Sequence, residues 1–163
     1  MSEINEPKKR LIAIRIRGNV GIRRSIKETL QYLRLFKVNH AVLLDDRKSY
    51  KGMLQKIKDY ITWGQIDQST LIQLITKRGR LMGNLPLTDE YIKKYTKYNS
   101  IKEFSNALFN LEIEIKNLPF LKPIFRLHPP KKGFKYSKKR AYKASGELGN
   151  RGPEINPLLL RMI

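Results

Sequence analysis

The sequence contains no cysteine, so disulfide bonds, cysteine-ligated zinc and iron–sulfur clusters are excluded. No uninterrupted apolar run approaches the roughly 18–20 residues that span a bilayer, and the polar N-terminus lacks the apolar core of a signal peptide. We therefore expect a protein that stays in the compartment where it is made and has no membrane partner. Nothing in the sequence suggests a cofactor, a metal site or a small-molecule substrate.

Acidic residues are also scarce. The chain has 14 Asp and Glu against 34 Lys and Arg, a formal net charge of +20. Such an excess makes a small protein repel itself and bind anions, which indicates a polyanionic partner. Hydrophobic residues make up 40% of the sequence, enough for a core that a disordered basic chain would lack. A folded protein that binds nucleic acid is the default interpretation.

The positive charge lies at the two ends of the sequence. Residues 1–60 carry 15 basic and 6 acidic side chains, residues 61–121 carry 8 and 6, and residues 122–163 carry 11 and 2. Two basic regions thus flank a nearly neutral middle that we expect mainly to pack on itself. We divide the chain into a core over 1–66, a helical region over 67–119 that packs on the core, and an extended basic segment over 120–163.

The first 66 residues predict alternating strands and helices. Residues 11–17 form a strand by the period of two, with Ile12, Ile14 and Ile16 on one face and Arg15 and Arg17 on the other. A helix to about residue 35, a strand over 37–45, a helix around 50–57 and a strand over 60–66 follow. This order is a split βαβ arrangement, an α+β fold with helices on one sheet face and the arginine-bearing face open or covered by something else.

The middle of the chain predicts further helices. Asp67 begins one that ends at Gly79, Thr88 begins a second, and Ser100 with Glu103 forms a capping box. The stripe after Ser100 predicts a helix that continues to Pro119. Beyond residue 121 the chain is rich in Pro, Gly and Lys, so we expect an extended segment over the surface with a short turn or helix at about 157–162.

Basic side chains of the first helix form a stripe opposite its apolar face. At 100° per residue, Arg23, Lys27 and Arg34 lie within about 40° of one another, with Arg24 beside them. A fixed basic stripe suits phosphate contacts. The preceding Gly18-Asn19-Val20-Gly21 lies between a strand and a helix N-terminus, where backbone N–H groups bind phosphate, although a plain tight turn explains it equally well.

Two other regions supply candidate contacts. Lys48 and Lys51, beside Gly52, lie on the polar side of the second helix, where solubilising and RNA-binding roles are equally plausible. Segment 122–151 holds ten basic residues and one acidic residue, interleaved with aromatic rings. Cations for phosphates and rings for unstacked bases suit irregular RNA, and we expect the segment to order on binding RNA. The first strand adds Arg15 and Arg17 as candidate contacts. The candidates from segment 122–151 are Arg126, His128, Lys131, Lys132, Phe134, Lys135, Tyr136, Lys138, Lys139, Arg140, Lys143 and Arg151.

The residues do not favour an enzyme. The two histidines, His40 and His128, lie far apart, and His40 beside a buried strand suits a partly buried structural role. Asp45-Asp46 and Asp89-Glu90 are explained by a strand end and a helix first turn. A nuclease would need a carboxylate cluster. A DNA-binding chromatin protein remains the alternative, and a DNA reader usually offers a helix to the major groove.

Several stretches resemble the archaeal and eukaryotic branch of one ribosomal family. They are residues 11–18 with Ile22-Arg23-Arg24, the stretch Ser49-Tyr50-Lys51-Gly52-Met53-Leu54, the strand Tyr60-Ile61-Thr62-Trp63-Gly64, the Pro129-Pro130-Lys131-Lys132-Gly133 run and Gly149-Asn150-Arg151. In order and spacing they are similar to the large-subunit ribosomal protein family L-thirty, called L-seven in eukaryotes. The likeness covers about residues 10–163.

This resemblance implies a ferredoxin-like core with helical additions and a C-terminal extension. It implies a non-enzymatic structural constituent of the large ribosomal subunit in the cytoplasm, which binds large-subunit rRNA near the 5S rRNA and meets neighbouring ribosomal proteins. The family's RNA contacts are spread over many residues. The N-terminal arm has only about nine residues, whereas eukaryotic relatives carry a long basic one, so we expect the archaeal-type form.

Overall fold

The computed structural model describes residues 9–163, so the predicted N-terminal arm lies outside the described residues except for Lys9. The helices of this part are α1 (Arg24–Tyr32), α2 (Lys48–Lys56), α3 (Gln68–Arg78), α4 (Asp89–Tyr95), α5 (Ile101–Phe109) and α6 (Ile155–Met162). The strands are β1 (Arg10–Arg15), β2 (His40–Asp45), β3 (Ile61–Gln65), β4 (Phe125–Arg126), β5 (Ser137–Ala141) and β6 (Gly146–Asn150). Short 3₁₀ turns cover Ile115–Asn117, Tyr142–Ala144 and Gly152–Glu154.

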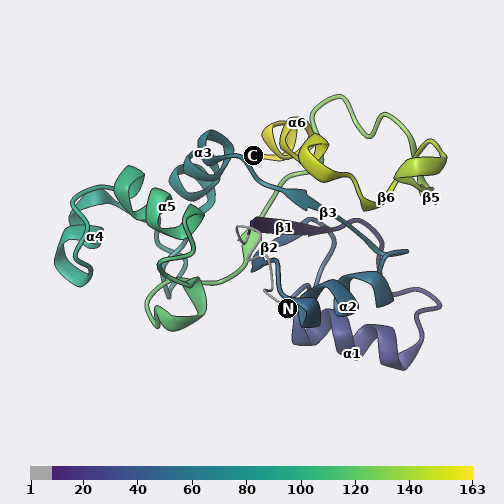
Figure 1. Cartoon of the computed structure of the whole chain (residues 1–163), viewed down its shortest axis with the longest axis horizontal. Coiled ribbons are helices and arrows are strands. Elements are labelled where there is room, and N and C mark those ends of the chain that lie inside the picture. Colours follow the sequence, from purple (N-terminus) through teal and green to yellow (C-terminus); the bar gives the residue numbers. More distant parts are fainter. Residues whose placement is uncertain (1–8) are drawn as a thin grey trace, which may run out of the picture.

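The strands form one sheet in the order β4-β2-β1-β3-β6-β5. The central strand β1 is antiparallel to both β2 and β3. Strands β2 and β3 are therefore parallel to each other with β1 between them, and α2 connects them. This is the split βαβ unit that the sequence predicts, and the α+β ferredoxin-like fold class is confirmed (Figure 1).

Helices cover both faces of this sheet, because side chains alternate along β1. Ile12 and Ile14 belong to the core that α3 and α6 close, whereas Leu11 and Ala13 belong to the core under α1 and α2. Figure 1 shows the two pairs of helices on opposite sides of the strands. The sequence predicts the helices of the βαβ unit on the isoleucine face of β1 and leaves the Arg15 face open or covered by something else. In the structure α1 and α2 cover the face that carries Ala13 and Arg15, and the isoleucine face is covered by α3 and by the far end of the chain, which local patterning does not reveal.

The helices of the middle region begin where the sequence predicts. The side chain of Thr88 accepts from the backbone N–H of Tyr91 at 3.4 Å, and that of Ser100 accepts from Glu103 at 3.2 Å. The last of these helices ends much earlier than predicted, at Phe109 rather than at Pro119. Leu111 is left-handed with φ of 63°, a conformation that stops an α-helix. Only a 3₁₀ turn follows before residue 119.

The C-terminal region is folded into the sheet instead of lying extended over the surface. Strand β4 pairs with β2 through Phe125 and Ala41, and β6 pairs in parallel with β3 through Gly149 and Thr62. Helix α6 confirms the predicted terminal helix and begins slightly earlier. It buries Leu158, Leu159 and Met162 in the core on the α3 side of the sheet. Residues 125–163 thus build a large part of the scaffold.

Candidate nucleic-acid interface

The loop between β1 and α1 is the most exposed part of the first basic region. Gly18, Asn19 and Gly21 are exposed, and Gly21 takes a left-handed φ of 67°. The backbone N–H of Ile22 donates to the backbone carbonyl oxygen of Asn19 at 3.3 Å, which closes the loop into a tight turn. Arg17 is half-buried, with its guanidinium carbon 5.2 Å from the centre of the Tyr60 ring. The turn presents backbone N–H groups beside a helix start, a geometry that favours anions.

Helix α1 presents exposed cations on the side away from its core. Arg23, Arg24 and Lys27 are all exposed, while Leu30 is fully buried on the other side. Arg24 is partly neutralised by Glu28 across 2.8 Å, an exposed pair that contributes little to stability. The predicted stripe is present over this part of the helix.

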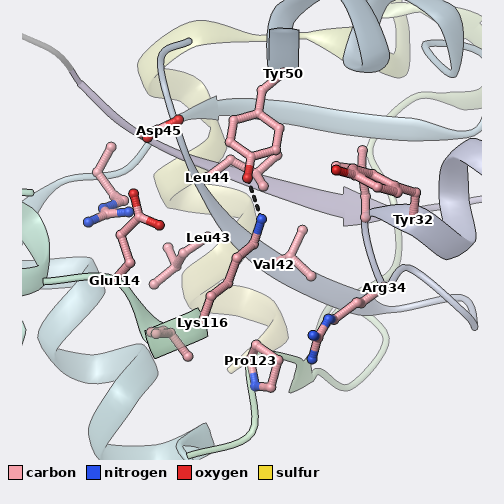
Figure 2. A pocket seen from close by; sticks show the side chains of 13 residues that line it. Tyr32, Arg34, Val42, Leu43, Leu44, Asp45, Tyr50, Glu114, Lys116 and Pro123 are labelled. Carbon is pink, nitrogen blue, oxygen red and sulfur yellow. Dashed lines mark hydrogen bonds between the residues drawn. The ribbon is translucent and has the colours of Figure 1, made fainter. Parts of the chain in front are cut away.

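Arg34 does not continue the stripe. Helix α1 ends at Tyr32, and Arg34 adopts a left-handed φ of 61° just beyond it. Its exposed side chain lies beside a hollow along β2 (Figure 2). The prediction placed Arg34 on the helix because apolar residues continue at helical spacing to Leu33, which extended the helix to about residue 35.

Charged groups around this hollow pair with one another. Figure 2 shows Lys116 directed toward Tyr50, and its ammonium donates to the phenol oxygen. Arg47 bridges Asp45 and Glu114, each at 2.5 Å, and these two carboxylates raise its pKa. A cation that is already paired with a carboxylate gains less binding energy from a phosphate. The paired cations around the hollow are therefore a weaker anion site than the exposed cations of α1.

The candidates on α2 form a separate group. Lys48, Lys51 and Gly52 are exposed, and Lys51 is paired with Asp46 at 2.9 Å. They follow the end of β2 that pairs with Arg10, the first residue of β1. The β1–α1 loop follows the other end of β1. The structure therefore does not bring these residues to that loop.

Two of the predicted contacts are buried instead. Arg15 is 2% exposed, and its guanidinium donates to the carbonyls of Arg17 and Leu35 at 2.8 Å and of Phe36 at 3.0 Å. Burial lowers its pKa. The prediction of Arg15 as a phosphate contact is corrected to a structural role, in which it ties the β1–α1 loop and the chain after α1 to the sheet end.

Arg151 is the second buried arginine. It is 8% exposed, and its guanidinium pairs with Glu147 at 2.6 Å and donates to the Thr62 hydroxyl at 2.8 Å. The Tyr142 ring covers it at 4.9 Å from the guanidinium carbon. Its Nε and Nη2 donors are thus used within the fold, and its predicted role in RNA contact is corrected to one of holding β6 against β3.

The C-terminal segment carries the densest set of exposed cations. All five residues of β5 are exposed. Phe134 is half-buried against the core, and the Lys138 ammonium lies 5.7 Å from its ring centre. Lys135 lies 5.3 Å from the ring centre of exposed Tyr136. The other exposed candidates of this segment are Arg126, His128, Lys131, Lys132, Lys139, Arg140 and Lys143.

Strand pairing brings the loop and this segment to the same end of the sheet. Arg15, the last residue of β1, pairs with Ile61, and Thr62 beside it pairs with Gly149 of β6. Figure 1 shows the β1–α1 loop and strands β5 and β6 at the same end of the molecule. We call this surface the basic end, defined by Arg17–Lys27 and 134–143. Sequence reasoning missed Lys37, which is exposed just before β2 at this end.

The residues weighed for catalysis have structural explanations. His40 is half-buried, and burial, followed by Arg126, Lys37 and Arg15, lowers its pKa. Asp45 and Asp46 pair with Arg47 and Lys51. Within residues 9–163 no cluster of three or more His, Asp or Glu side chains is suited to hold a metal ion. None of the helices formed by these residues is both long and apolar enough to cross a membrane.

Several known proteins are similar to this chain in sequence. The family described as Ribosomal protein L30p/L7e matches residues 11–61. Three archaeal relatives, from Methanocorpusculum labreanum, Methanopyrus kandleri and Archaeoglobus fulgidus, are each 50% identical over 149 residues. The alignments cover 91% of this chain and 97%, 100% and 97% of the relatives.

All three relatives are named large ribosomal subunit protein uL30. Nothing in these matches supports the DNA-binding alternative. With half of the aligned residues identical over nearly the whole length, the chain belongs to the L30p/L7e family of ribosomal proteins.

Proposed function

We propose that this protein is a structural constituent of the large ribosomal subunit that binds and stabilises rRNA through its basic end. The observation that carries the proposal is a concentration of exposed cations on a packed scaffold: Arg23, Lys27 and the cations of 135–143. The uL30 relatives support the assignment to the large subunit. Neighbouring ribosomal proteins are further expected partners, and the site of action is the cytoplasmic ribosome.

The mechanism is phosphate neutralisation on a preformed surface. Each cation that meets a phosphate releases a condensed counterion, which makes binding strongly salt-dependent. Helix α1 and strand β5 fix the spacing of these cations, so the surface selects a backbone shape. Aromatic rings at 134 and 136 offer stacking surfaces for unpaired bases. This is a binding function, and we assign the protein no enzymatic step.

Sedimentation tests the assignment. A cell lysate is fractionated on a sucrose gradient in Mg²⁺ buffer, and the protein is expected to co-migrate with large subunits and to remain there after a high-salt wash. A protein that stays at the top of the gradient, or that moves with DNA and is released by a DNA-specific nuclease, would contradict it.

We further propose that the basic end faces rRNA near the 5S rRNA, as the family resemblance implies. Because the chain contains no cysteine, a single introduced cysteine gives an unambiguous attachment point. An iron chelate on Lys139→Cys is expected to cleave 5S rRNA and its surroundings in reconstituted subunits. A chelate on Gln73→Cys, exposed on α3, is the matched control. Cleavage from position 139 confined to distant rRNA would remove the 5S proposal and leave the ribosomal assignment intact.

A further inference from the structure

A second exposed surface lies at the opposite end of the molecule from the basic end, around α4 (Figure 1). Its floor consists of two isolated antiparallel bridges: Arg80 pairs with Pro86 across a short turn, and Leu81 pairs with Leu121 from a distant part of the chain. Two backbone hydrogen bonds of 2.9 Å flank the pair of Leu81 and Leu121. The N–H of Met82 donates to the carbonyl of Phe120, and the N–H of Lys122 donates to the carbonyl of Arg80.

The second bridge decides which residues lie beside each other at this surface. Leu81 and Leu121 are 5% and 2% exposed and point into the core. The backbone hydrogen bond between Met82 and Phe120 places these two residues across from each other beside that pair. Met82 is 62% exposed. Arg80 and Lys122, joined by the other hydrogen bond, are both half-buried and bring two cations next to the apolar pair.

Helix α4 adds two rings to this face. The ring centres of Tyr91 and Tyr95 are 4.4 Å apart, and they lie 5.5 Å and 6.0 Å from that of Phe120. Tyr91 and Phe120 rest on the core, whereas Tyr95 is 51% exposed. The outermost ring is thus held in place by two others. A ligand that stacks on it does not have to order it first.

The charge around the rings is positive. The Lys94 ammonium lies 5.3 Å from the centre of the Tyr95 ring, and Lys93 and Lys97 are exposed nearby on the chain. Of the two carboxylates in the first turn of α4, that of Asp89 accepts the backbone N–H of Ile101 at 2.7 Å and is already used. Cations beside a fixed ring match a nucleotide, whose phosphate and base need both groups at once.

We propose that the Tyr95 surface, defined by Arg80, Met82, Tyr91, Lys94, Tyr95, Phe120 and Lys122, binds an unpaired nucleotide of large-subunit rRNA. Its base stacks on Tyr95 beside Met82, and its flanking phosphates meet Lys94 and Lys122. The proposal rests on the rRNA-binding function proposed above and extends it to a second site. The protein then links two RNA segments that approach its two opposite ends.

The test uses the full chain and large-subunit rRNA stripped of protein. Tyr95→Ala is expected to weaken binding by about tenfold, the usual scale for loss of one stacked base. Tyr95→Phe keeps the ring and should bind as the unaltered protein does. Thermal unfolding of both variants checks that the fold is intact. Ultraviolet crosslinking of the unaltered protein should join a nucleotide to residues 80–98 or 120–122 as well as to 131–143.

The outcomes separate this proposal from the one it rests on. Crosslinks at 131–143 with none around Tyr95, together with unchanged binding by Tyr95→Ala, would overturn the second site and leave the basic end standing. No rRNA binding at all would remove both proposals. If Tyr95 crosslinks only to another protein in assembled subunits, the surface is a protein interface and the nucleotide proposal is wrong.

Discussion

Arg10 at the start of β1 binds the carbonyl oxygen of Leu108 near the end of α5 with two donors, Nε at 2.8 Å and Nη2 at 2.6 Å. The same Nη2 reaches the Ile113 carbonyl at 3.1 Å. Arg10 is only 5% exposed, so burial lowers its pKa, opposed by Asp45 and Glu114. One guanidinium therefore joins the central strand to a helix that lies about a hundred residues away in sequence. The C-terminal end of a helix, with its unpaired carbonyl groups, favours a cation.

Replacing Arg10 by Lys is expected to lower the free energy of unfolding by about 2 kcal/mol. A lysine retains the charge but not the two-donor geometry, and hydrogen bonds to charged groups contribute about 1.5–3 kcal/mol. Urea denaturation measures the change. The exposed neighbour provides the control, since Lys9→Ala should alter stability by less than about 0.5 kcal/mol. Equal effects of the two substitutions would contradict the anchoring role of Arg10.

The Glu147→Gln substitution should destabilise the protein by about 3 kcal/mol, because removing one charge of a buried pair leaves Arg151 uncompensated. The Glu147 carboxylate also accepts the backbone N–H of Tyr136 at 2.8 Å, and a glutamine offers one acceptor oxygen to the two donors, so segment 131–143 should loosen. Trypsin is expected to cut there faster than in the unaltered chain. Glu154→Gln at an exposed carboxylate is the control. Unchanged cleavage in Glu147→Gln would show that the segment is held by other contacts.

Arg15 and Arg23 should give opposite results. Arg15→Lys is expected to reduce stability and leave the salt dependence of rRNA binding unchanged, because its guanidinium is turned to backbone carbonyls. Arg23→Ala should leave stability within about 0.5 kcal/mol and reduce the slope of log affinity against log salt by about one. Filter binding at several salt concentrations separates the two. A reduced slope for Arg15→Lys would restore Arg15 as a phosphate contact.

Two glycines should respond in opposite directions to alanine. A Cβ at Gly64 would lie 2.0 Å from the Gly152 carbonyl oxygen and 3.0 Å from the Ile155 Cβ, so Gly64→Ala should cost about 1–3 kcal/mol by overpacking. Gly52 lies in α2 with open space around it, and Gly52→Ala should stabilise by about 0.5–1 kcal/mol. Calorimetric melting temperatures report both. A stable Gly64→Ala would mean that β3 and the turn after β6 can separate without cost.

Stability should fall as the pH drops from 7 toward 5, in part because of His40. Burial lowers its pKa in the folded state, so the unfolded chain binds the proton first as the pH falls through the ordinary range near 6.5. Above that range both states are neutral and His40 contributes nothing to the pH dependence. His40→Gln should flatten the slope of unfolding free energy against pH. An unchanged slope in His40→Gln would assign the effect to other groups.

Local signals in the sequence predict much of the scaffold. The period of two in β1 and the caps at Thr88 and Ser100 depend on neighbours within a few residues, and each of them is confirmed. Strand β6 depends instead on Thr62, whose hydroxyl donates to the Gly149 carbonyl across 87 residues of chain. A segment rich in glycine and lysine carries no pattern from which such distant pairing can be read.

The candidate surface is predicted less completely than the fold. An arginine on a strand has the same sequence signature whether it meets phosphate or, like Arg15, a set of buried carbonyls. Burial decides between them, and it depends on the chain returning after α1. The Tyr95 surface was not predicted, for two reasons. Its tyrosine rings pack against Phe120, which is distant in sequence, and the surrounding residues 61–121 are nearly neutral in net charge. Net charge over a long window hides a small cluster of lysines.

The pairing of β6 with β3 has a consequence for synthesis. Residues 146–163 supply a strand beside β3 and a helix that closes one of the two cores, and the guanidinium of Arg78 at the end of α3 donates to the Ile163 carbonyl at 2.6 and 3.1 Å. These contacts cannot form until residues 146–163 have been synthesised, so one side of the core stays uncovered in the nascent chain until then. The basic segment at 131–143 leaves the exit tunnel before its own support does. Chains interrupted before residue 146 therefore carry the cations for RNA binding but lack the strand and the helix that support their spacing.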